Sequence, residues 1–225
     1  MNRTTTSFLV AALTLIYFDG VAQAQDNKQG TSAQSSTVAN SAQQLTLKER
    51  EFADKLLKET ETGVFASVKD LSPAQLSFKA APEKWSIEEC VKHIAAAEES
   101  LWAMVATSLQ QAPNPESRKD IKFSDQDLIS AVEDRSHKSK TFDALEPANS
   151  PYKTTAEALA AFKANREKLI DFVKHTKLDL RNHVSVLPIG TYDAYQFIML
   201  IAAHSNRHTQ QIDEVKKSVN FPAKP

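Results

Sequence analysis

The sequence of 225 residues contains little cysteine, little glycine and almost no net charge. Cys90 is the only cysteine, so no intrachain disulfide can form and stability must come from burial. With only four glycines, the chain contains no phosphate-binding glycine loop and no nucleophile elbow. Lysine plus arginine number 27 against 28 aspartates plus glutamates, without a basic stripe. This charge balance excludes the electrostatic pattern of a nucleic-acid-binding protein.

The first 24 residues are typical of a secretory signal. Arg3 precedes an apolar stretch at residues 8–18, and residues 22–24 read AQA, a small-residue cleavage motif. The stretch is shorter than the roughly 20 apolar residues that a membrane-spanning helix needs. We therefore expect an exported protein, periplasmic or secreted, with no stable membrane span after cleavage at residue 24. Retention of the segment as an anchor is the alternative.

Three further regions follow this segment. Residues 25–44 are polar, have no aromatic residue and show no apolar period, so we expect a flexible linker. Residues 45–219 contain the expected folded domain, and residues 220–225 form a short C-terminal tail.

Within the domain, a Ser or Thr is repeatedly followed three residues later by an acid, a pairing that caps the first turn of a helix. These pairs are Thr46 with Glu49, Ser86 with Glu89, Ser124 with Asp127, and Thr154 with Glu157.

Apolar residues recur at helical spacing after each of these starts, and no run alternates with a period of two. In the first helix the expected apolar face includes Phe52 and Val64, and Thr191 is the expected cap of the last helix. Proline-containing loops separate the helices. The sequence therefore predicts an all-α fold, a four-helix bundle with short additional helices, in which a site is built from side chains on facing helices.

Two histidines, His204 and His208, are separated by one turn of the last expected helix. At about 100° per residue they share the apolar face with Phe197 and Ile201, so both should point toward the core. A single buried histidine is usually a neutral imidazole that its neighbours satisfy, but two at this spacing can bind one cation together. His93, at the edge of the apolar face of the second helix, is the candidate third ligand. The other histidines are expected at the surface: His137, His175 and His183.

A second group of polar residues falls on apolar helix faces. Glu98 lies in the middle of one face of the second helix, and Arg166 lies at the corresponding place in the fourth. Since a buried charge is costly unless paired, we expect Glu98 to contact Arg166 or Arg207, in a structural role or as support for a metal ligand. Glu98 is also a weak candidate for a catalytic general base. Cys90 is a possible fourth ligand, but such a residue is more often a small core hydrophobe.

Three pieces of sequence occur in the same order as in a known family: LSPAQLSFKAAPEKWS, then KWSIEECVKHIAAAEE, then PIGTYDAYQFIMLIAAHSNRHTQQIDEVK. Over about residues 47–217 the chain resembles the DinB-like superfamily, a four-helix fold that includes metalloenzymes. The resemblance implies a divalent metal ion, most often zinc or nickel, bound by one histidine of the second helix and the HxxxH of the last. At the matching positions this chain has His93, His204 and His208.

The resemblance also implies a class of activity. Relatives in this superfamily include thiol-dependent transferases and isomerases that use cytoplasmic thiols, and some members form homodimers. Because an exported chain would not meet those thiols, metal-dependent hydrolysis of a small molecule is favoured over thiol transfer. The alternative is a non-catalytic periplasmic module that binds metal or a partner. An enzyme should leave a coordination position open toward a cleft, whereas a structural site should be closed by a fourth protein ligand.

Overall fold

The computed structural model describes residues 44–137, 140–187 and 189–224. The expected signal segment and nearly all of the expected linker lie outside these residues. The helices and strands of the described part follow one another as α1 Leu47–Val68, α2 Pro73–Ser77, α3 Ile87–Ser108, α4 Asp125–Glu133, α5 Thr155–His175, β1 Val184–Leu187, β2 Gly190–Asp193 and α6 Ala194–Lys216. Short 3-10 helices lie at Pro115–Asp120, Asp143–Leu145 and Pro147–Asn149.

The long helices begin where the Ser and Thr pairs predict. Complete capping boxes open α1 at Thr46, α3 at Ser86 and α5 at Thr154, and the Ser124 side chain caps α4. Each box satisfies amide groups that the first turn leaves without partners. The expected cap of the last helix was wrong, because Thr191 lies in β2 and the Asp193 carboxylate instead accepts from the backbone N–H of Gln196.

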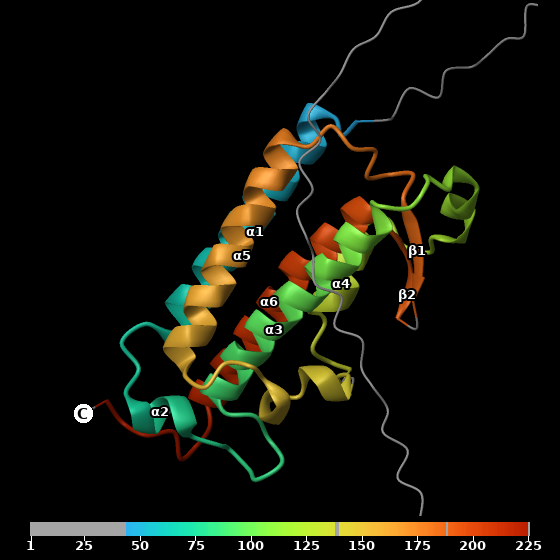
Figure 1. Cartoon of the computed structure of the whole chain (residues 1–225). Helices are drawn as coiled ribbons and strands as arrows, with labels where there is room; N and C mark the ends of the chain where they lie inside the picture. The colour runs from blue at the N-terminus through green and yellow to red at the C-terminus, as the bar shows by residue number, and fades with distance from the viewer. Residues whose placement is uncertain (1–43, 138–139, 188, 225) are drawn as a thin grey trace, which may run out of the picture. The chain divides into compact units, whose positions relative to one another are not determined.

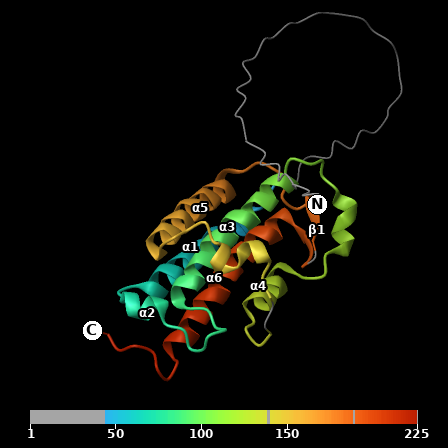
Figure 2. The same ribbon diagram turned by 60° about the horizontal axis from the view of Figure 1, so that its bottom comes forward.

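Four long helices form the bundle, in agreement with the predicted fold class (Figure 1). α1 and α3 each pack against both α5 and α6, so α1 is diagonal to α3. The shorter α4 packs against α6, and Figure 2 shows it on the side away from α5. No helix in the described part of the chain is long and apolar enough to cross a membrane.

The hairpin before α6 departs from the all-helical prediction. β1 and β2 are antiparallel, with Val184 opposite Asp193 and Leu187 opposite Gly190. Two strands of four residues are too short to show a period of two, and their pairing depends on a turn that ends at Gly190, where φ is 137°. The expectation that His183 is exposed was also wrong. Its ring is buried beside β1, where Nε2 lies 3.1 Å from the carbonyl oxygen of Gln111.

The core consists of two apolar clusters at opposite ends of the bundle. One joins the first half of α1, the second halves of α3 and α5, and the first half of α6; the other joins the remaining halves. Val64 belongs to the second cluster, but Phe52, expected on the same face, is exposed because Ala53 and Leu57 form the buried face of α1. Between the clusters lies a layer of buried polar side chains: Thr60, Glu98, Arg166 and Ser205.

The residues after α6 also contribute to packing. The expected tail includes Phe221, whose ring makes an edge contact with that of Phe78 at a centroid distance of 5.5 Å. The Gln75 side chain of α2 donates to the carbonyl oxygen of Pro222. The chain up to Pro222 therefore covers the end of the bundle beside α2, although periodicity alone gave no reason to include it.

Candidate metal centre

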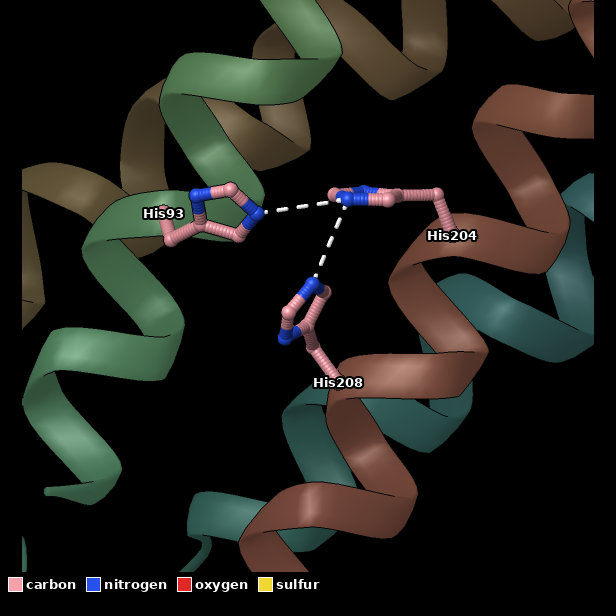
Figure 3. Close-up of side chains that lie close together, drawn as sticks. All are labelled: His93, His204 and His208. Atoms are coloured by element: carbon pink, nitrogen blue, oxygen red, sulfur yellow. Dashed lines mark hydrogen bonds between the residues drawn. The ribbon is translucent and has the colours of Figure 1, made fainter. Parts of the chain in front are cut away.

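The three histidines predicted as ligands meet between α3 and α6 (Figure 3). His93 comes from α3, and His204 and His208 from successive turns of α6. The Nε2 atom of His204 lies 3.2 Å from Nε2 of His93 and 3.2 Å from Nε2 of His208. One nitrogen from each ring thus lies within 4.8 Å of the other two, which is the convergence that the sequence predicted.

Hydrogen bonds at the far side of two rings fix which nitrogen carries the proton. His93 Nδ1 is 2.8 Å from the carbonyl oxygen of Leu145, which can only accept. His208 Nδ1 is 2.9 Å from Oε1 of Gln211, an oxygen that also accepts from Arg135. Both Nδ1 atoms therefore donate, and both Nε2 atoms direct a lone pair at His204. A neutral His204 has only one N–H, so it cannot satisfy both lone pairs.

The electrostatics of the cluster keep all three rings uncharged near neutral pH. Burial lowers the pKa of His204 to about 3, and the neighbouring His93 ring and Arg207 guanidinium further disfavour a charge on His204. Burial and the two other imidazoles hold the pKa of His208 well below 6.5, and burial lowers that of His93. Because a metal binds the neutral imidazole, the rings need lose no proton to act as ligands at pH 7. This donor set fits a borderline divalent cation.

Trp85 packs directly on the cluster. Its ring stacks on His208 with an interplanar angle of 20° and a centroid distance of 5.8 Å, and it lies 4.8 Å from the His93 ring. Its position immediately before the Ser86 cap places this indole at the start of α3. The apolar ring limits the space open to the imidazoles and helps to hold their orientation.

A cavity of about 830 Å³ opens beside the histidines, and all three line it. Cys90 does not belong to the histidine group. It is buried in the second of the two apolar clusters of the core, where burial raises the pKa of its thiol to about 12. It therefore stays a protonated thiol, as expected of a core residue. Within the described residues no carboxylate or thiol completes the group as a fourth ligand.

Glu98 and Arg166 form the buried pair predicted from the helix faces. Arg166 Nε and Nη2 each donate to a different Glu98 carboxylate oxygen at 2.7 Å, and both side chains are buried. Glu98 does not line the histidine cavity, so this geometry gives no support to its candidate role as a general base. The alternative partner was wrong: Arg207 donates to the carbonyl oxygens of Val132, Asp134 and His137, at the end of α4.

Three contributors to the centre were missed by sequence reasoning. The Leu145 carbonyl comes from a short 3-10 helix whose position only the fold decides. Trp85 directly precedes the Ser86 cap, but its contact with two imidazole rings depends on the packing of α3 against α6. Gln211 was detectable in principle, because it follows His208 by three residues and so lies on the same side of α6. The two remaining histidines, His137 and His175, are exposed as predicted.

Comparison with known proteins agrees with this fold. A model of the DinB superfamily matches residues 56–212, and the chain belongs to that superfamily. It is similar to the uncharacterized protein YuaE of Bacillus subtilis (strain 168), with 25% identity over 167 residues, which cover 73% of this chain and 97% of YuaE.

The fold is also similar to that of YfiT from Bacillus subtilis, described as a probable metal-dependent hydrolase with an unusual four-helix bundle topology. The TM-score is 0.55 at 14% sequence identity, and the alignment covers 79% of this chain and 91% of YfiT. At this level of identity the likeness to YfiT shows a common fold.

Proposed function

We propose that the protein binds one divalent metal ion, zinc or nickel, through His93, His204 and His208, and hydrolyses a small molecule at that ion. The observation that carries this proposal is the convergence of three neutral imidazole nitrogens at the wall of a cavity. Three ligands with no fourth from the described residues are typical of catalytic rather than structural zinc sites. The description of YfiT as a probable metal-dependent hydrolase is consistent with it.

The residues around the imidazoles have separate tasks in this proposal. A bound divalent ion would supply Lewis acidity and lower the pKa of water. The Leu145 carbonyl and the Gln211 side chain hold the Nδ1 protons, so the Nε2 lone pairs of His93 and His208 face the site. Trp85 excludes water from one side of the rings. Thiol transfer on the same site is the second candidate, favoured only by the superfamily to which the chain belongs.

Elemental analysis of the protein, purified without a polyhistidine tag, tests metal binding. Near-stoichiometric zinc or nickel is expected in the native protein and background levels in a His204→Ala/His208→Ala variant. His175→Ala is the matched control, because this exposed histidine lies outside the group and should leave the metal content unchanged. An equal metal content in all three proteins would contradict the proposed ligands. Hydrolysis is then tested with ester, amide and lactone substrates, comparing metal-loaded protein with chelator-treated protein.

We further propose that the chain is exported and that residues 1–24 are removed, on the strength of the N-terminal pattern. The intact mass of the protein from a secreting host measures this directly. A mass that retains these residues would contradict cleavage and leave the anchor as the better explanation. Homodimer formation, implied by the superfamily, is measured by light scattering.

A further inference from the structure

The histidine cavity has walls of two different chemical characters. On one side of the imidazoles its lining is charged and includes Glu83, Lys84, Arg135 and Glu214. On the other side it is formed by aliphatic and aromatic side chains, which we call the apolar arm: Leu101, Phe123, Leu128, Ile189, Tyr192 and Leu200. The histidines therefore lie at the junction between a polar mouth and an apolar arm.

The helices give the apolar arm its direction and length. On α3, Ala97 and Leu101 follow His93 by one and two turns, about 6 and 12 Å along the axis. On α6, Leu200 precedes His204 by one turn. Ala97, Leu101 and Leu200 belong to the same apolar cluster, so both walls run from the histidines toward the same end of the bundle. The arm thus extends on the order of 12 Å from the imidazoles.

The apolar arm offers a ligand no side-chain polar group that lacks a partner. Its one side-chain oxygen is that of Tyr192, and this hydroxyl donates to the carbonyl oxygen of Ile189. A polar ligand entering the arm would therefore lose hydrogen bonds to water without replacing them there. Hydrocarbon loses none.

Three large apolar side chains around the cavity remain partly exposed. Phe123, Phe142 and Ile189 keep 42%, 51% and 45% of their surface exposed, although each lines the cavity. They come from three separate segments. Phe123 lies just before α4, Phe142 just before the 3-10 helix Asp143–Leu145, and Ile189 between β1 and β2. Exposed apolar residues grouped around one cavity are typical of a ligand-binding surface, whereas scattered ones need no explanation.

We propose that the ligand of this site is an amphiphilic small molecule, with a polar head at the histidines and a hydrocarbon portion in the apolar arm. The proposal deepens the proposed function and rests on it for the position of the head. The cavity volume of about 830 Å³ lies within the range of ~300–1,000 Å³ common for small-molecule sites. The arm selects for hydrocarbon because burying methylenes there is favourable and burying polar groups is not.

A chain-length series measures the apolar arm directly. Zinc-loaded protein is titrated calorimetrically with aceto-, butano-, hexano- and octanohydroxamate, which share one metal-binding head. Each added methylene should tighten Kd by up to about fourfold, so the series should span on the order of a hundredfold or more. A Kd that does not change with chain length, in protein containing stoichiometric zinc, overturns the proposal while leaving the metal site intact.

A pair of variants on one hairpin locates the effect. Ile189→Asn places an amide in the arm and should remove most of the gain from the longer chains, with little change for acetohydroxamate. Val186→Asn is the matched control, because Val186 is on the same hairpin, is 75% exposed and does not line the cavity. Equal chain-length dependence in both variants would contradict the assignment of the arm to this wall.

A second series, of n-alkanols with metal-free protein, separates the two proposals. In metal-free protein, n-alkanols from butanol to octanol compete with a fluorescent apolar dye, and longer alkanols should displace it at lower concentration. If zinc does not bind but this dependence persists, the proposed metal function fails and the apolar arm stands. If neither hydroxamates nor alkanols show a dependence on length, the inference itself is wrong.

Discussion

Two groups of buried polar side chains lie side by side in this bundle and differ in how completely they are satisfied. Arg166 uses all five of its N–H donors, on both oxygens of Glu98, the Leu57 carbonyl, and the hydroxyls of Thr60 and Ser205. The three histidines instead direct nitrogens at one another, and one N–H cannot serve two lone pairs. Ser205 follows His204 directly on α6, so adjacent residues belong to these different groups.

The difference separates a structural group from a binding group. Buried polar atoms normally have hydrogen-bond partners, and the ion pair obeys that rule within the protein itself. The histidine cluster obeys it only when something else occupies the space between the nitrogens. The ion pair is closed by four helices, whereas the histidines face a cavity. In this bundle, buried polar side chains therefore indicate a binding site where their hydrogen bonds are not all satisfied by other groups of the protein.

The largest effect on stability is expected from breaking the Glu98–Arg166 ion pair. Arg166→Met leaves the Glu98 carboxylate buried without its partner, which should lower the free energy of unfolding by ~3–5 kcal/mol and the melting temperature by about 10 °C. Calorimetric melting of the metal-free protein measures it. Adding Glu98→Leu to Arg166→Met should recover much of the loss. A double variant that melts as low as the single one would contradict a role confined to mutual neutralisation.

A smaller effect is expected from removing the Gln211 side chain that orients His208. Gln211→Ala removes the acceptor for His208 Nδ1, which should weaken zinc binding by roughly 10–100-fold through loss of ring orientation. Competition with a chromophoric chelator gives the affinity. The matched control is Gln210→Ala, whose side chain donates instead to the Glu133 carbonyl. Equal affinity in the two variants would show that Gln211 does not orient the ligand.

Acid should act on the metal-free protein through the histidines. Their pKa values are lowered in the fold, to about 3 for His204, while the unfolded chain keeps values near 6.5. The unfolded state therefore binds more protons below pH 6.5, so stability present above that pH is lost as the pH falls toward 3. Urea titrations between pH 7 and 4 measure this slope. It should be shallower in the His204→Ala/His208→Ala variant; an unchanged slope would assign it to other groups.

The smallest effect on stability is expected when the His208–His204 nitrogen contact is removed from the metal-free protein. His208→Leu replaces an incompletely bonded imidazole with a side chain of apolar character, so the melting temperature should change by only a few degrees in either direction. The same substitution should abolish stoichiometric zinc. A loss of stability as large as that of Arg166→Met would mean that the histidines serve the fold in the way the ion pair does.

Much of the fold and of this contrast could be read from the sequence. The capping pairs mark the starts of α1, α3, α4 and α5 because cap chemistry is local. Helical spacing identified the histidine pair and the Glu98–Arg166 pair. The hairpin, the buried position of His183 and the exposure of Phe52 were missed. Each of these depends on contacts between segments far apart in the chain, which local spacing does not encode.

By itself, the sequence determined which faces of the helices carry polar groups and which residue types stand ready to bind a cation. This follows because a helix places residues three and four apart on one side. Only the tertiary structure decided that Arg166, not Arg207, neutralises Glu98, that Leu145 and Gln211 orient the imidazoles, and that an apolar arm runs from them. These depend on the packing of α3 and α6 with a loop and a hairpin, and such distances exist only after the chain has folded.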